Sequence, residues 1–300
     1  MKHAVIGIGS NSVRMLITDI NGRVGTRLRR DRAGTRLFAG LGSDGRLDEA
    51  AMEKTVDAVA TMAEAARAEG CVEVLLFATS ATRDAANQAD FAALLRERAG
   101  VELTVTPGEE EAALSFLGAT GPGRCGVIDI GGGSTEIVVG EGDRLDAAFS
   151  CQMGAVRLSR MLPIASVADM EPVIALADGL LAEKLPEGLA LPESWYATGG
   201  TFTTLAALQR GGPWELREGL HGTLLRREKV EELGRLLADM PMEERLRLPQ
   251  LQPARADIIV HGICILIACM RRLGIAGIRV SEYGNLDGYT KKHYGLTELR

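Results

Sequence analysis

Two stretches of the sequence decide the fold: residues 4–17, AVIGIGSNSVRMLI, and residues 126–139, GVIDIGGGSTEIVV. They match without a gap at an offset of 122 positions. Each reads as an apolar strand, a turn of Gly and Ser, and a second strand. A further glycine turn follows each copy, because glycine supplies the positive φ that tight hairpins need. One supersecondary unit used twice predicts two domains of like topology that face each other across a cleft.

The residues outside the repeats alternate between helical and strand patterns. Positions 48–68 and 83–99 carry apolar residues at helical spacing, whereas 72–78 and 102–106 read as strands. After the second repeat we expect a helix near 166–185, a strand at 194–197, and a polar, helical region at 211–253 that prolines interrupt. This order predicts an α/β fold with mixed sheets flanked by helices.

Gly and Pro cluster at residues 119–123, which is typical of a domain border. We therefore expect an N-terminal domain over 1–119 and a C-terminal domain over 120–300. Whether the last helix packs back on the N-terminal domain is left open.

Composition and charge exclude several classes of protein. The 300 residues have a formal net charge of −6 and a sequence pI of about 5.4, so no global basic field attracts nucleic acid or an anionic membrane. The dense basic run at 27–32 is read as a solvated strand edge in preference to a binding patch. The apolar stretch 258–270 is too short to span a bilayer and predicts a buried helix that carries His261 in the core.

Cysteine usage and the first residues favour a reduced, cytoplasmic protein. The five cysteines show neither a CxxC pair nor metal-ligand spacing, so we expect reduced core residues. Residues 1–3 lead directly into an apolar strand, without the apolar region of a signal sequence. A cytoplasmic location is therefore expected.

The turn of the second repeat has the residues to bind phosphate and a divalent cation. Asp129 ends an apolar strand and is followed by Gly131, Gly132, Gly133 and Ser134. Glycine lets backbone N–H groups close around an anion, and the carboxylate beside them would hold a metal ion. An Asp that only caps the turn is the alternative. The matching turn of the first repeat, Ser10, Asn11 and Ser12, favours the phosphate-binding interpretation.

A third turn of this kind, Gly199, Gly200 and Thr201, joins a strand to a helix whose N-terminal amides would attract an anion. An ordinary capped junction is the alternative for this turn. Among charged residues, Glu111 stands where an acidic helix start enters apolar sequence, and we interpret it as a candidate general base. Arg14 and Arg83 are candidate phosphate ligands, with solvated surface arginines as the alternative.

Nine motifs in order resemble the exopolyphosphatase / guanosine pentaphosphate phosphatase family, within the superfamily of sugar kinases, heat-shock ATPases and actin. They are GSNS at 9–12, ATSATR at 78–83, EEA at 110–112, DIGGGSTE at 129–136, MGAVR at 153–157, GGTFTT at 199–204, HG at 221–222, RAD at 255–257 and SEYG at 281–284. The resemblance covers nearly the whole chain. It implies duplicated actin-like domains with the active site in the cleft between them.

The resemblance also implies an activity and a set of roles. The activity is hydrolysis of a terminal phosphate from inorganic polyphosphate or guanosine pentaphosphate, with magnesium (Mg2+) and an in-line water. Glu111 would orient that water, Asp129 and Glu136 would hold the metal, and the three glycine turns would bind phosphates. Arg14, Arg83 and Arg255 would complement the negative charge. The expected partner is polyphosphate or a phosphorylated guanine nucleotide, without nucleic acid or membrane, and a homodimer is left open. The alternative is a phosphate- or nucleotide-binding regulator with weakened catalysis.

Three positions depart from the family pattern. Gly7 stands where an Asp is usual, Ala113 where an Arg is usual, and Leu286 lies in a terminal turn that commonly contains Arg. The missing carboxylate at Gly7 predicts weak magnesium binding. Gly7→Asp is expected to restore a ligand if the backbone there is an ordinary strand that a side chain can occupy.

Overall fold

The computed structural model describes residues 1–121 and 123–300, so residue 122 of the predicted border region lies outside the described residues. The chain divides into two compact units. Unit 1 comprises Met1–Gly118 and Asn285–Arg300, and unit 2 comprises Ala119–Gly284. The C-terminal segment, whose last helix was left open to either domain, thus belongs with the N-terminal half of the chain.

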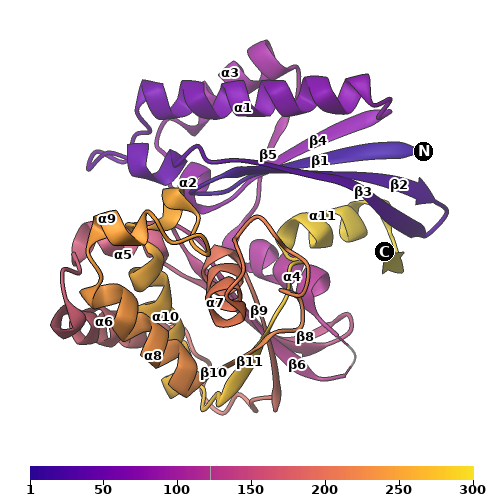
Figure 1. Ribbon diagram of the computed structural model, residues 1–300. Coiled ribbons are helices and arrows are strands. Elements are labelled where there is room, and N and C mark those ends of the chain that lie inside the picture. Colours follow the sequence, from indigo (N-terminus) through magenta and orange to yellow (C-terminus); the bar gives the residue numbers. More distant parts are fainter. Residues whose placement is uncertain (122) are drawn as a thin grey trace. The chain divides into compact units, whose positions relative to one another are not determined.

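Unit 1 contains a mixed sheet with the strand order β12-β3-β2-β1-β4-β5. The strands are β1 (Lys2–Ile8), β2 (Val13–Asn21), β3 (Val24–Ala33), β4 (Glu73–Ala78), β5 (Leu103–Val105) and β12 (Glu298–Leu299). Strands β1, β2 and β3 form an antiparallel meander, and β1, β4 and β5 run parallel. The long helices α1 (Glu49–Ala68) and α3 (Gln88–Ala99) lie along one face of this sheet, and α11 (Asn285–Tyr294) lies on the other (Figure 1).

Unit 2 repeats this arrangement with the strand order β10-β11-β9-β6-β7-β8. Its strands are β6 (Cys125–Ile130), β7 (Thr135–Glu141), β8 (Arg144–Cys151), β9 (Ser194–Thr198), β10 (Leu224–Arg226) and β11 (Gly277–Val280). Here β6, β7 and β8 form the antiparallel meander, and β6, β9 and β11 run parallel. The predicted α/β fold with two mixed sheets flanked by helices is confirmed.

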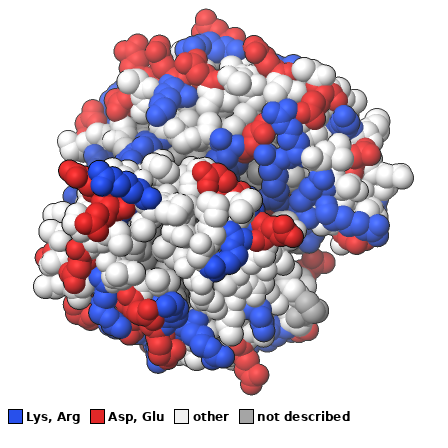
Figure 2. All heavy atoms as spheres, in the orientation of Figure 1, with Lys and Arg blue, Asp and Glu red and all other residues white. Residues whose placement is uncertain are grey.

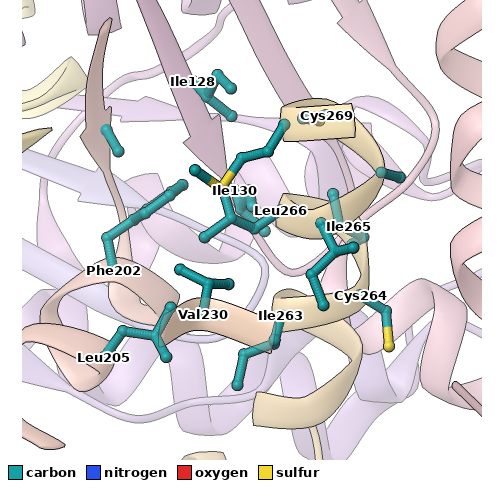
Figure 3. Packing of buried hydrophobic residues seen from close by; sticks show 14 of the residues in the cluster. Ile128, Ile130, Phe202, Leu205, Val230, Ile263, Cys264, Ile265, Leu266 and Cys269 are labelled. Carbon is teal, nitrogen blue, oxygen red and sulfur yellow. The ribbon is translucent and has the colours of Figure 1, made fainter. Parts of the chain in front are cut away.

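The core of unit 2 is built around helix α10 (Ile259–Arg272), which is buried at every position from Ile259 to Met270. Its apolar side chains pack against strand β6 and the neighbouring helices (Figure 3). His261 on this helix is buried and its Nε2 lies 2.9 Å from the carbonyl oxygen of Leu162. Burial lowers the pKa of His261, because the charged ring would lose its hydration. The predicted buried helix and core histidine are confirmed.

The remaining helices of the two units are short or moderate in length. They are α2 (Ser80–Arg83), α4 (Gly108–Ala119), α5 (Ala155–Met161), α6 (Met170–Ala182), α7 (Gly200–Arg210), α8 (Arg227–Asp239) and α9 (Met242–Arg245). No helix within the described residues has the length and apolar character needed to cross a membrane. All five cysteines are free; four are buried, and Cys71 is half-buried.

Two local predictions need correction. The helix predicted over 83–99 begins only at Gln88, because the Asn87 side chain bonds both backbone groups of Leu47, at 2.9 and 3.0 Å, and so turns the chain. The region 211–253 is helical only in α8 and α9, after an irregular stretch and strand β10. Both departures come from contacts or turns that helical periodicity does not encode.

Candidate functional site

The candidate residues of unit 1 lie where three parallel strands end. Strands β1, β4 and β5 are parallel, so their carboxyl ends meet at one edge of the sheet. The Ser10–Ser12 turn follows β1, helix α2 follows β4, and helix α4 follows β5. This edge is the usual ligand-binding edge of a parallel α/β arrangement. The topology therefore gathers the turn, Arg83 and Glu111 within unit 1.

The Ser10–Ser12 turn presents its amide side to a ligand, because its carbonyl groups are already engaged. The oxygens of Ser10, Asn11 and Ser12 accept from the N–H groups of Phe38 (2.9 Å), Arg36 (3.2 Å) and Gly9 (3.0 Å), respectively. Asn11 is 8% exposed, and both its amide atoms are buried without a hydrogen-bond partner in the described part of the chain. A buried, unsatisfied amide costs about 1–3 kcal/mol unless a ligand or water satisfies it. The turn is thus suited to a polar ligand.

Glu111 is held as the partner of Arg83. It lies in the first turn of α4, and its side chain is 6% exposed. Arg83 Nη1 donates to Glu111 Oε2 at 3.1 Å and to the carbonyl oxygen of Thr106 at 2.8 Å. The Nη2 atom of Arg83 is buried and has no hydrogen-bond partner among the described residues. One end of the guanidinium group therefore fixes the carboxylate, and the other end holds an unsatisfied donor of the kind that binds phosphate oxygen.

Arg14 is fixed by a different element. Its Nη2 donates to Asn285 Oδ1 at 2.9 Å, at the start of α11. In the sheet Arg14 lies directly opposite Gly7. The sequence did not single out Asn285, because 271 residues separate it from Arg14.

The glycine turn of unit 2 has the same backbone arrangement as the turn of unit 1. Gly131 N–H donates to the carbonyl oxygen of Ser134 at 3.0 Å. The Gly131 carbonyl accepts from Ala155 N–H at 3.0 Å, and the Gly132 carbonyl accepts from Val156 N–H at 2.9 Å. Among the described residues no acceptor pairs with the N–H of Gly132 or Gly133. Carbonyls tied to helix α5 leave these amides to face an anion.

Gly154 explains how closely helix α5 approaches this turn. A Cβ atom at Gly154 would lie 2.3 Å from the carbonyl carbon and oxygen of Gly132 and 2.4 Å from Gly133 N. Arg157 Nε adds a hydrogen bond of 2.6 Å to the Gly133 carbonyl. Gly154 and Arg157 belong to the quoted motif at 153–157 but were not predicted to position the turn.

Asp129 and Glu136 form a cross-strand pair of carboxylates. They are directly opposite in the β6–β7 ladder, which places both side chains on the same face of the sheet. They are 8% and 1% exposed, and Glu136 Oε1 accepts a hydrogen bond of 2.8 Å from Ser150 Oγ. Within residues 1–121 and 123–300, no group of three or more His, Cys, Asp or Glu side chains is placed to bind a metal ion. The pair offers two carboxylates as hard oxygen ligands.

The Gly199–Gly200 turn packs closely against the end of strand β6 and against Arg255. Gly199 has φ 109°, and a Cβ there would lie 2.7 Å from the Ile130 carbonyl oxygen and 3.2 Å from Asp129 Oδ1. Gly200 begins helix α7, and a Cβ on it would lie 1.5 Å from Arg255 Nη1. A guanidinium group beside a helix N-terminus is unfavourable unless an anion lies between them. Thr201 is 3% exposed and packs against Gly262 of α10.

The structure also shows the surroundings of the three positions that depart from the family pattern, Gly7, Leu286 and Ala113. A Cβ at Gly7 would lie 2.9 Å from Phe77 Cζ and 3.5 Å from Leu286 Cδ1. Phe77 stacks on Tyr289 with ring centroids 4.5 Å apart. Apolar side chains thus fill the space beside position 7, so the condition that a side chain can occupy this position is not met without a shift of Phe77. Ala113 is half-buried in α4.

Unit 1 has an amide-lined turn at a strand end and a Glu–Arg ion pair, and unit 2 has a second such turn and two paired carboxylates. These are features of a phosphohydrolase. A model of the Ppx/GppA phosphatase family matches residues 16–292, so the chain belongs to that family. The predicted class, a phosphohydrolase acting on acid anhydrides, is confirmed by this match and by the curated relatives.

Two curated relatives come from Mycobacterium tuberculosis. The chain is 30% identical to exopolyphosphatase 1, covering 96% of this chain and 87% of the relative, and 32% identical to exopolyphosphatase 2, covering 95% and 96%. Among solved structures, an exopolyphosphatase-like protein is 28% identical with a TM-score of 0.87, over 98% of this chain and 99% of that one. The Aquifex aeolicus PPX-GPPA enzyme is 26% identical with a TM-score of 0.79, over 97% and 99%.

We expect Gly154→Ala to lower turnover about 10- to 100-fold, because a displaced phosphate turn misplaces the substrate. The backbone of Gly154 is extended, at φ −127°, so the added methyl group acts through its contact with the turn. Gly179→Ala on helix α6 is the matched control, since a Cβ there has no atom within 4 Å. The measurement is steady-state phosphate release; a Gly154→Ala enzyme as active as the control would remove α5 from this role.

We expect Gly7→Asp to destabilise the protein by about 1–3 kcal/mol, because the side chain overpacks the space beside Phe77. Magnesium affinity should not rise. Thermal unfolding and calorimetric metal titration test both statements, and Gly7→Ala separates the steric effect from the charge. A stable Gly7→Asp protein with tighter magnesium binding would contradict this packing argument.

Proposed function

We propose that this protein hydrolyses the terminal phosphoanhydride of inorganic polyphosphate by means of magnesium and a water molecule that Glu111 orients. Family membership and the named exopolyphosphatase relatives support polyphosphate as the substrate. The observation that carries the proposal is the ion pair between buried Glu111 and half-buried Arg83, in which Arg83 Nη2 has no hydrogen-bond partner among the described residues. Guanosine pentaphosphate is the second substrate to test, because the resemblance of the sequence motifs implies it as the alternative substrate.

Glu111 has the surroundings of a general base. Its pairing with Arg83 at 3.1 Å restricts the orientation of the carboxylate. Phosphoryl transfer requires a positioned nucleophile and charge neutralisation more than covalent chemistry. A carboxylate that accepts a proton from water, next to a guanidinium group that binds phosphate oxygen, supplies both requirements.

The described residues fit a magnesium ion at Asp129 and Glu136. Magnesium prefers oxygen ligands and usually keeps several waters, so two carboxylates plus substrate phosphates are a sufficient donor set. Asp129 and Glu136 are both more than nine-tenths buried and lie on one face of the sheet. The bound ion would neutralise phosphate charge. The turns at Gly131–Ser134 and Gly199–Thr201, together with Arg255, would bind and orient the phosphate groups.

Glu111→Gln should lower turnover about 10²- to 10⁴-fold, the usual contribution of a positioned base. The matched control is Glu109→Gln, which changes an exposed carboxylate in the first turn of the same helix. Phosphate release is measured from polyphosphate and from guanosine pentaphosphate, and substrate binding is measured separately. If Glu111→Gln releases phosphate at the wild-type rate, Glu111 is not the base.

Asp129→Asn should raise the magnesium concentration needed for half-maximal activity, because an amide is a poorer ligand than a carboxylate for a hard cation. Asp143→Asn, in the exposed turn between β7 and β8, provides the control. Activity is titrated with magnesium for both variants after thermal unfolding shows that they are folded. Identical titrations would exclude Asp129 from the metal site.

A further inference from the structure

Four arginines lie on the α11 face of the unit 1 sheet, and we name them the arginine strip: Arg14, Arg27, Arg30 and Arg32. Arg14 on β2 lies directly opposite Arg32 on β3. Arg30 lies opposite Leu16, which packs in the apolar cluster with Leu286 of α11. Residues two apart on a strand point to the same face. The strip therefore borders the edge of helix α11.

A β-bulge brings Arg27 onto the same face. The β2–β3 register shifts between Ile17 and Thr18, so that Ile17 pairs with Arg29 and Thr18 pairs with Arg27. Leu28 is the extra residue, and it is 47% exposed. Without the bulge, Arg27 would point to the opposite face, where Arg29 lies.

Contacts with α11 hold the strip in place. Arg27 and Arg30 both donate to Asp287 Oδ1, and Asp287 is 1% exposed. Arg14 donates to Asn285. Asp287 and Asn285 of α11 thus hold three of the four guanidinium groups of the strip. Residues 27–32 lie on an open strand edge, as predicted, because β12 pairs with β3 only at Val24 and Gly25. Arg27 and Arg30 in addition pair with Asp287.

The strip is accessible and begins at the phosphate turn. The Arg30 side chain is 34% exposed, and Arg14 and Arg32 are half-buried. Figure 2 shows Lys and Arg side chains gathered over the region where β3 and α11 lie in Figure 1. Arg14 is two residues beyond Ser12, and from Arg32 to Arg27 the strand covers roughly 16 Å at 3.3 Å per residue.

We propose that the arginine strip binds the distal phosphates of a long polyphosphate chain whose end occupies the Ser10–Ser12 turn. The inference rests on the proposed function, which supplies the substrate. A continuous polyanion can contact successive guanidinium groups, each of which matches phosphate oxygens in bidentate geometry. A chain too short to extend beyond the turn gains nothing from the strip. The strip therefore sets a preference for long chains.

The test compares the Michaelis constants for short and long polyphosphate, expressed as the ratio of long-chain KM to short-chain KM. Arg32→Gln should raise this ratio roughly five- to tenfold, as expected for one partly exposed charged contact. Arg30→Gln should raise the ratio by a similar factor, and Asp287 keeps Arg27 as its partner in this variant. The matched control is Arg29→Gln, on the same strand but on the opposite face, and its ratio should equal that of the wild type.

Direct binding separates a failure of this inference from a failure of the proposed function. Calorimetry with long-chain polyphosphate at several salt concentrations should give a log Kd versus log salt slope that falls by about one for Arg32→Gln. Unchanged KM ratios and unchanged binding in both folded variants would overturn the strip. Equally strong competition by single-stranded nucleic acid would also overturn it, since the surface would then bind polyanions in general. If the protein cleaves no polyphosphate but the strip variants bind long-chain polyphosphate more weakly than the wild type, the proposed function is wrong and the binding role of the strip is supported.

Discussion

The rest of the structure depends on one hydrogen bond that occurs twice, from a glycine N–H to a serine carbonyl three residues later. It joins Gly9 to Ser12 and Gly131 to Ser134, at 3.0 Å in both turns. The bond closes each turn, and neighbouring helical segments engage the other carbonyls of the turn. The amide groups are thereby left for an anion, at the edge where parallel strands end. A turn closed differently would direct carbonyl oxygens toward a phosphate and repel it.

The features that could be predicted from the sequence are those encoded locally. The repeated hairpins, the glycine turns and the buried helix α10 each follow from a short pattern of apolar residues and glycine. Asp129 and Glu136 stand directly opposite each other in the β6–β7 ladder, a pairing that the gapless repeat already implies. This register supports their predicted roles. Their function in metal binding stays a prediction.

What the sequence could not show are contacts between residues far apart in the chain. Asp287 joins Arg27 and Arg30 across more than 250 positions, and it holds these two arginines of the basic run in place on the strand edge. Phe77 fills the space beside Gly7, although 70 residues separate them. The break before Gln88 has the same cause, since Asn87 bonds Leu47. Periodicity describes one element at a time and contains no information on such partners.

The two repeats carry opposite charge at equivalent positions, and this difference suits them to opposite ligands. In unit 2 the cross-strand pair is Asp129 and Glu136, two carboxylates suited to a cation. In unit 1 the same pair is Gly7 and Arg14, a space filled by apolar side chains beside a guanidinium group suited to phosphate. The backbone hydrogen bonds of the turns are kept in both copies. Both copies thus keep the same turn geometry, while their strands carry two carboxylates in one copy and a guanidinium group in the other. This difference agrees with the proposed division between a metal site in unit 2 and phosphate binding in unit 1.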